Sequence, residues 1–181
     1  MHLKNSSASL NRVKNQKIVI RDAHAEEAPR VALVLRAAYT QYKSEMPPDA
    51  WQYYLADIMD VRARMKESQL IVAEVEGNLA GTVTLYTHGR SQIEGNWPEG
   101  WGGVRLLGVD PKYRGMGLGR MLMDECMRRC RAEGMKTVGL HTAPMMAVAK
   151  AMYERMGFQH VPEFDHHPRP GVTIMAYKLD L

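Results

Sequence analysis

Residues 104–130 read VRLLGVDPKYRGMGLGRMLMDECMRRC, and this stretch decides the fold. A short apolar run ends at an Asp-Pro pair, after which Gly115, Gly117 and Gly119 alternate directly before a helical pattern. Glycine has no Cβ atom, so it permits positive φ angles and lets a ligand approach the backbone closely. The free N–H groups of the first helical turn and the helix dipole then favour an anion there. The stretch therefore predicts a strand, a glycine-rich loop and a helix that together bind a pyrophosphate.

The helical pattern runs to about Glu133 and is amphipathic. Arg114 and Arg120 flank the glycines with positive charge, which suits a phosphate. The two cysteines stand four residues apart on the apolar face, and we interpret them as core residues. We expect this helix to pack one side on a sheet while its N-terminus stays open to a ligand. Its apolar face consists of Leu122, Met123, Cys126, Met127 and Cys130.

The glycine loop differs from the two commoner nucleotide-binding loops. No Gly-Lys-Ser/Thr follows, so it is not the phosphate loop of nucleoside triphosphatases. The spacing is Gly-x-Gly-x-Gly, and no acidic residue ends a second parallel strand about 20 residues further on, as the dinucleotide fingerprint requires. The structural alternative is a tight strand-to-helix turn that binds no ligand.

The remaining pattern predicts an α+β fold with one mixed central β-sheet flanked by helices, in the order β-α-α-β-β-β-α-β-α-β-β. Residues 1–16 are expected to form a flexible N-terminal tail, and residues 17–181 a single domain. Asp49 is expected to cap the second helix, and Glu76-Gly77-Asn78 is a hairpin signal. The expected elements are strand 17–22, helix 26–42, helix 49–65, two strands within 69–86, strand 104–110, a helix to 133, strand 136–142, helix 147–156, and strands 157–162 and 171–181.

Composition excludes several classes of protein. The net charge of +4 is mild and the basic residues are scattered, which disfavours a nucleic-acid binder. No apolar run approaches the roughly 18 residues that a membrane span needs, and the polar N-terminus does not resemble a secretory signal. Cys126 and Cys130 suit neither a disulfide scaffold nor a common metal site. We therefore expect a reduced, cytoplasmic protein.

Two motifs resemble the GCN5-related N-acetyltransferase (GNAT) family. Residues 114–119, Arg-Gly-Met-Gly-Leu-Gly, match its Arg/Gln-x-x-Gly-x-Gly/Ala acyl-CoA loop, and the preceding LLGVDPKY is similar to its fourth strand. Residues 149–158, AKAMYERMGF, resemble its second signature, a helix ending in Tyr-Glu-x-x-Gly-Phe. The motifs follow the family's order and spacing. The resemblance covers residues 17–181 and implies a single GNAT-like domain that uses acetyl-CoA as co-substrate and no metal.

The resemblance implies a role for each matched residue. The backbones of Leu107 and Val109 would pair with the pantetheine arm like an added strand, and the N–H groups from Gly115 to Arg120 would hold the pyrophosphate. Tyr153 would be catalytic, donating a proton to the leaving thiolate; taken alone, it would read as a packed helix tyrosine. The implied cofactor-binding residues are Leu107, Gly108, Val109, Arg114, Gly115, Met116, Gly117, Leu118, Gly119 and Arg120.

The chain departs from the family pattern at two places. Met146 stands where the family often has an Asn that contacts the CoA arm, and the fourth strand carries no carboxylate to serve as the base. Glu99, or a water wire involving His141 or Tyr86, could take that role, and an already neutral amine could also attack directly.

The acceptor pocket is expected between the first two helices, the loop 88–103 and the C-terminal strands. Aromatic residues there could stack on an acceptor or pack within the core. Asp165-His166-His167 lacks further ligands at metal spacing, so we expect solvated histidines in a loop rather than a metal site. The aromatic residues are Trp51, Tyr53, Tyr54, Trp97 and Trp101. The acids that could attract an amine are Asp57, Asp60, Glu94 and Glu99.

The leading hypothesis is an enzyme that moves an acetyl group from acetyl-CoA to a primary amine of a small molecule or a protein. The alternative is a non-catalytic acyl-CoA-binding sensor or regulatory module, which the missing carboxylate favours and Tyr153 disfavours. We expect no nucleic acid or membrane as partner. A homodimer is a further expectation, because the resemblance implies pairing through the C-terminal strands.

Overall fold

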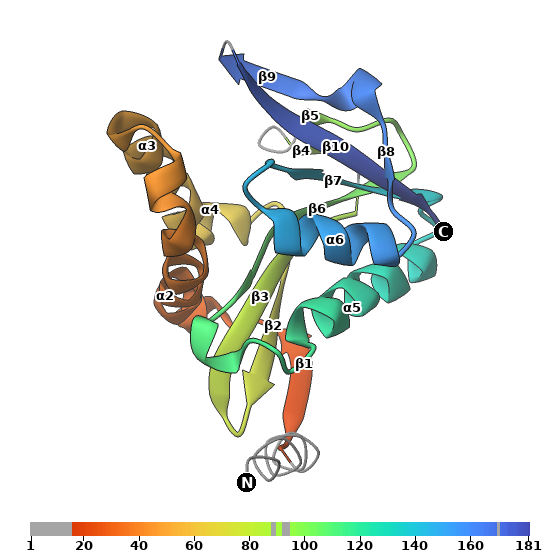
Figure 1. Cartoon of the computed structure of the whole chain (residues 1–181). Helices are drawn as coiled ribbons and strands as arrows, with labels where there is room; N and C mark the ends of the chain where they lie inside the picture. The colour runs from red at the N-terminus through yellow and green to blue at the C-terminus, as the bar shows by residue number, and fades with distance from the viewer. Residues whose placement is uncertain (1–15, 88–89, 92–94, 170) are drawn as a thin grey trace, which may run out of the picture.

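The computed structural model describes residues 16–87, 90–91, 95–169 and 171–181. A central sheet has the strand order β1-β2-β3-β6-β7-β10-β8, with β9 added on β10. Helices α2 and α3 lie on one side of the sheet, and α5 and α6 cover the other (Figure 1). Its strands are β1 (Ile18–Asp22), β2 (Gln69–Val75), β3 (Asn78–Tyr86), β6 (Trp101–Val109), β7 (Thr137–Thr142), β8 (Gln159–His160), β9 (His166–Arg169) and β10 (Val172–Asp180).

The helices and a short side ribbon complete the domain. The helices are α2 (Ala28–Tyr39), α3 (Pro48–Met59), α4 (Val61–Arg64), α5 (Leu118–Ala132) and α6 (Ala147–Arg155). The two-residue strands β4 (Arg90–Ser91) and β5 (Gly95–Asn96) pair with each other apart from the main sheet. This arrangement confirms the predicted α+β domain with a mixed sheet. The predicted N-terminal tail lies outside the described residues except for its last position.

The strands β6 and β7 form the one parallel pair of the described sheet, and they separate partway along their length. Their pairing ends at Val104 and Leu140. Beyond that point β6 stays paired with β3 as far as Val109, whereas β7 stays paired with β10 as far as Thr142. The sheet therefore opens into a V between the end of β6 and the end of β7.

The separation leaves part of the β6 backbone facing the opening. The Asp110 N–H donates to the carbonyl of Ala80 on β3 at 2.8 Å. Because the main-chain groups of successive strand residues point to opposite sides, those of Leu107 and Val109 point away from β3 and into the V. Just before them, Leu106 has a φ angle of 52°, and the register with β3 shifts at this place.

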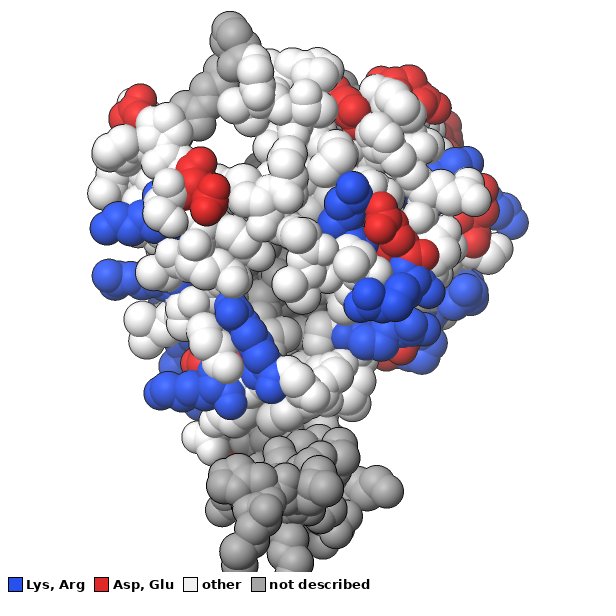
Figure 2. Space-filling view, viewed as in Figure 1, with Lys and Arg blue, Asp and Glu red and all other residues white. Residues whose placement is uncertain are grey.

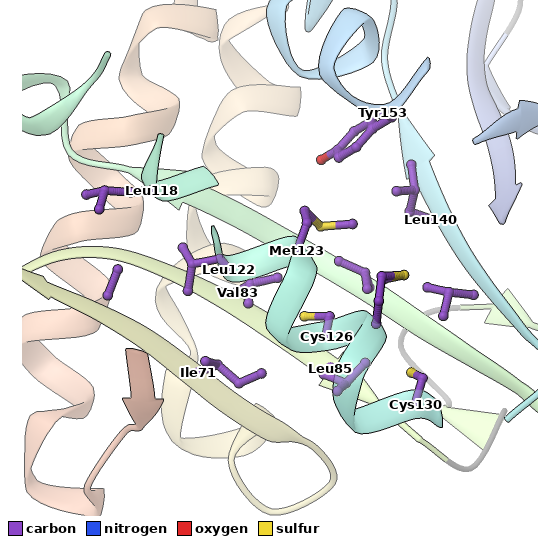
Figure 3. Close-up of a cluster of buried hydrophobic side chains, with 14 of the residues drawn as sticks. Ile71, Val83, Leu85, Leu118, Leu122, Met123, Cys126, Cys130, Leu140 and Tyr153 are labelled. Atoms are coloured by element: carbon purple, nitrogen blue, oxygen red, sulfur yellow. The ribbon is translucent and has the colours of Figure 1, made fainter. Parts of the chain in front are cut away.

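Two apolar cores hold the sheet between its helices. The face of α5 that the sequence predicts packs against β2, β3 and β7 (Figure 3). Both cysteines are buried and free, which confirms their interpretation as core residues. Burial raises the pKa of the Cys130 thiol to about 11 and that of Cys126 further. Neither thiol is therefore ionised near neutral pH.

Local signals are confirmed at one turn and are wrong at one helix. Glu76 and Gly77 have φ angles of 49° and 79°, so they form the tight turn predicted between β2 and β3. The expected helix from Asp49 to Met65 begins one residue earlier, with Pro47 as its N-cap, and breaks at Asp60. The Asp60 carboxylate accepts a hydrogen bond from the Ala63 N–H at 3.1 Å and starts α4 instead. The better cap thus divides the predicted helix in two.

Within the described part of the chain, no helix is long and apolar enough to cross a bilayer.

Candidate functional site

Two cavities open along the V between β6 and β7. The smaller, about 510 Å³, lies between the end of β6, the loop before α5, and α6. The larger, about 1150 Å³, lies between the start of α3, the parting ends of β6 and β7, and the β9–β10 hairpin. The cavities are neighbours, because five residues line both. The shared residues are Tyr39, Arg105, Leu106, His141 and Met146.

The glycine loop forms one end of the smaller cavity. Gly115 and Gly117 have φ angles of 79° and 78°, a conformation that other residues adopt at a cost. Gly117 is the N-cap of α5, and its carbonyl accepts the first intrahelical bond, from the Met121 N–H. The N–H groups of the first turn of α5 precede that bond and point out of the helix end. The loop therefore has the form of an anion cradle, and its residues fit a pyrophosphate.

Nearly all of the predicted cofactor-binding residues line this cavity. Met116 differs, since its side chain packs partly buried against the core. The guanidinium of Arg114 donates to the Ala38 carbonyl and to Gln41, both at 3.2 Å, so it bridges the loop to the end of α2. The exposed Arg120 pairs with Asp124 at 2.8 Å. The residues that line the cavity are Leu107, Gly108, Val109, Arg114, Gly115, Gly117, Leu118, Gly119, Arg120 and Tyr153.

The opposite wall of the smaller cavity supplies a tyrosine that the sequence did not single out. Tyr39, on α2, donates its hydroxyl to the carbonyl of Leu107 at 3.1 Å. Burial raises the pKa of Tyr39 well above its ordinary value, so the hydroxyl remains a donor. One lone pair of the Leu107 carbonyl is thus used inside the protein, and the carbonyl has a second one.

Tyr153 extends from α6 towards the V. Its side chain is 7% exposed and lines the smaller cavity. Its hydroxyl points away from Leu140 on β7 (Figure 3). The ring packs against Phe158, with centroids 5.9 Å apart. Core packing thus fixes the ring at the cavity wall, and a donor at such a place can serve as a general acid.

The larger cavity has an apolar wall and acidic residues at its mouth. Of the predicted aromatic residues, Tyr53 and Tyr54 line it, whereas Trp51 and Trp97 are buried in the packing beside it. Glu45, just before α3, and Asp49, in the first turn of α3, are exposed. In Figure 2 a hollow lies between α3 and the β9–β10 hairpin, and uncharged and acidic side chains border it on the α3 side, whereas Lys and Arg lie over α5 and α6 and lower down along the α2 side.

Two of the four predicted acids of the acceptor side make contacts within the protein. Asp57 forms an ion pair with Arg105 of β6, which the sequence did not single out. Asp60 caps α4, as described above. Glu94 lies outside the described residues. The ion pair of Asp57 could not be predicted from the sequence, because spacing along a helix does not show which cation lies opposite.

Of the three predicted candidates for the base, only His141 lines the two cavities. Glu99 and Tyr86 are not among the described residues that line either one. His166 is exposed, as expected for a solvated histidine, but it lies in β9 rather than in a loop, and its ring also contacts that of His141. Met146 also lines both cavities, so an apolar side chain occupies the position of the expected Asn.

Among the described residues, no group of three or more His, Cys, Asp or Glu side chains could hold a metal ion. The carboxylate of Asp165 accepts hydrogen bonds from the Ala176 N–H at 2.8 Å and contacts His160 Nε2 at 3.0 Å. This carboxylate therefore fastens the segment before β9 to β10.

Known proteins resemble the chain in sequence and in fold. Residues 33–158 match the model of the acetyltransferase (GNAT) family. Mycothiol acetyltransferase of Cellulomonas flavigena is 35% identical over 105 residues, which are 55% of this chain and 30% of that protein. N-acetylaspartate synthetase of Homo sapiens is 28% identical over 120 residues, 66% of this chain and 37% of that protein. The chain thus matches only about a third of the length of these relatives.

A solved structure matches nearly the whole domain. The PaiA N-acetyltransferase of Thermoplasma acidophilum, in complex with coenzyme A, superimposes with a TM-score of 0.71 at 15% identity. The match covers 90% of this chain and 99% of that one. At this identity the likeness supports the fold, and the site rests on the geometry above.

Proposed function

Because the chain belongs to the acetyltransferase (GNAT) family, we propose that it transfers an acetyl group from acetyl-CoA to a primary amine. One observation carries the proposal: the glycine cradle and Tyr153 line one cavity, and that cavity meets a second, larger one at shared residues. A donor and an acceptor can therefore be held end to end. We assign this activity to residues 17–181 as one domain.

The smaller cavity would hold acetyl-CoA, and the predicted residues divide the work. The N–H groups from Gly115 to Arg120 bind the pyrophosphate at the positive end of α5. The open backbone of Leu107 and Val109 binds the pantetheine arm as an added strand would. Tyr153 donates its hydroxyl proton to the departing thiolate. When bound, acetyl-CoA supplies the thioester that the amine attacks.

The larger cavity would receive the acceptor. Its apolar wall, with Tyr53 and Tyr54, suits an amine with an apolar body. Its exposed acids, Glu45 and Asp49, favour the approach of a cation, which is the form of most free amines near neutral pH. The names of the two relatives indicate small acetylated products, so we propose a small-molecule amine ahead of a protein. We further propose a cytoplasmic location and a homodimer.

The test is a screen of amines with detection of free thiol. The full chain is incubated with acetyl-CoA and with α-amino acids, arylalkylamines, polyamines, lysine peptides or peptides with a free N-terminus. Amine-dependent thiol release supports the transferase. Stabilisation by acetyl-CoA without thiol release from any of these amines would contradict it and favour the sensor.

We predict that saturating acetyl-CoA raises the melting temperature. A ligand at 100 times its dissociation constant stabilises the folded state by about 2.7 kcal/mol, which for a domain of this size is about 5–10 °C. Differential scanning fluorimetry measures the shift. S-acetyl-N-acetylcysteamine, which keeps the thioester but lacks the pyrophosphate, is the matched control and should shift the curve little. No shift at millimolar acetyl-CoA would exclude the cofactor assignment.

A further inference from the structure

His141 lies where the two cavities meet. It follows Leu140, the residue at which β7 leaves β6. Its side chain lines the smaller cavity, where Tyr153 lies, and also the larger one. If the proposed function is correct, a side chain at this junction faces both the thioester and the attacking amine.

The His141 ring is held on three sides. It stacks on Trp97, with ring centroids 4.7 Å apart and an interplanar angle of 23°. His166 lies against it, with centroids 4.4 Å apart. Its Nε2 lies 3.0 Å from the carbonyl oxygen of Phe164. These contacts fix both the position and the rotation of the ring.

The Phe164 contact also assigns the tautomer. A carbonyl oxygen can only accept a hydrogen bond, so Nε2 must carry the proton and donate it. In the neutral ring Nδ1 then has no hydrogen and carries a lone pair in the plane of the ring. The nitrogen left to act as a base is therefore Nδ1.

The surroundings favour the neutral ring. Burial lowers the pKa of His141, and the neighbouring His166 lowers it further, whereas the Phe164 carbonyl and Asp165 act in the opposite direction. Because the net shift is downward from an ordinary value of about 6.5, the ring holds its lone pair at neutral pH. It loses that lone pair only as the pH falls through the lowered pKa. The other titratable or charged residues that line its two cavities are Tyr39, Tyr42, Glu45, Asp49, Tyr53, Tyr54, Arg105, Tyr113, Arg114, Arg120, Tyr153, Arg155 and His166.

We propose that His141 is the general base of the acetyl transfer, accepting the proton of the attacking amine on Nδ1, directly or over one water molecule, while the Phe164 carbonyl holds its Nε2–H. The amine nitrogen forms a bond to the acetyl carbon as its N–H proton passes to Nδ1. The bond from that carbon to sulfur breaks, and the sulfur takes the hydroxyl proton of Tyr153. The imidazolium then returns its proton to solvent, from which the tyrosinate regains one. The role explains how a site whose fourth strand carries no carboxylate can still activate an amine.

The test compares His141→Gln with the wild-type full chain, using acetyl-CoA and the amine that releases most thiol in the screen. Glutamine can still donate an amide N–H to the Phe164 carbonyl, but it has no basic nitrogen. We expect kcat/KM at pH 8 to fall about 100-fold or more, with the stabilisation by acetyl-CoA unchanged. The ratio of wild-type to variant rates cancels the amine's own ionisation. That ratio should fall towards one as the pH drops through the lowered pKa of His141.

His160→Gln is the matched control, because His160 lies on β8, pairs with Asp165 and contributes to neither cavity wall. It should keep the wild-type rate. If kcat/KM of His141→Gln is within threefold of the wild-type value, or if the rate ratio does not depend on pH, His141 is not the base, although the chain can still be a transferase. Absence of thiol release from the wild type would overturn both.

A second readout needs no acceptor. Long-range proton–nitrogen NMR of the histidine-labelled protein should show a protonated Nε2 and an unprotonated Nδ1 for His141 at pH 7.5. The opposite tautomer, or a charged ring at that pH, would overturn the assignment of Nδ1 as the base.

Discussion

Replacing Tyr153 by phenylalanine is expected to reduce kcat about 100-fold or more while leaving the affinity for acetyl-CoA nearly unchanged. The ring is 7% exposed and packs against Phe158, so phenylalanine can keep the packing and lose only the hydroxyl. A proton donor acts mainly in the transition state, because the thiolate gains its charge only as the carbon–sulfur bond breaks. The loss should therefore be in kcat rather than in binding. Steady-state kinetics and the thermal shift with acetyl-CoA measure the two effects separately.

Tyr177→Phe is the matched control for this substitution. Tyr177 is also a buried tyrosine, and its hydroxyl donates to Glu154 at 3.2 Å outside both cavities. We expect its removal to leave the rate unchanged. If Tyr153→Phe is as active as Tyr177→Phe, the hydroxyl is not the acid, and water must protonate the thiolate.

The substitution Gly139→Ala is expected to reduce both stability and activity. A Cβ atom at this position of β7 would lie 2.8 Å from two carbon atoms of the Trp97 ring. That ring has little room to retreat, because it also stacks on Trp101 and His141. Such overpacking costs roughly 1–3 kcal/mol, or about 2–12 °C in melting temperature. Because Trp97 supports His141, the displaced ring should also lower kcat.

A compensating change tests the mechanism of this loss. Trp97→Phe in the Gly139→Ala background provides a smaller ring, so it should recover part of the stability that Gly139→Ala loses. The two single variants and the double variant form a thermodynamic cycle whose coupling energy measures the contact. A Gly139→Ala variant with an unchanged melting temperature would show that Trp97 can move away from the new Cβ atom without loss of stability.

The elements that the sequence predicts well are those with strong local signals. The glycines before α5, the turn at Glu76 and Gly77 and the apolar face of α5 are all encoded by neighbouring residues. The break at Asp60 was missed because an aspartate can occupy a helix interior or cap the next helix equally well by pattern alone. The preference of Asp60 for the cap depends on how α4 packs, which local pattern does not contain.

The residues of the candidate site also differ in whether local sequence pattern can predict them. One wall of the smaller cavity, within residues 107–120, is continuous in sequence and could be chosen by pattern, whereas Tyr39 enters the opposite wall from α2. The acceptor side is assembled from distant segments, and its contacts depend on tertiary structure. Asp57 pairs with Arg105, which lies 48 positions away in the sequence. The His141 ring contacts Phe164 and His166 only because β9 folds back on β10. No periodicity in His166-His167-Pro168 signals that strand, and proline disfavours it.

The parting of β6 from β7 places a strand edge in the middle of the sheet rather than at its border. An exposed edge is a hazard for soluble proteins, because its unpaired N–H and C=O groups can recruit strands from other molecules and start aggregation. Here the edge at Leu107 and Val109 is walled by Tyr39 on one side and by α6 on the other. A slender linear molecule can enter this slot, whereas a sheet cannot. The fold therefore keeps the pairing capacity of an edge strand while denying it to other polypeptides.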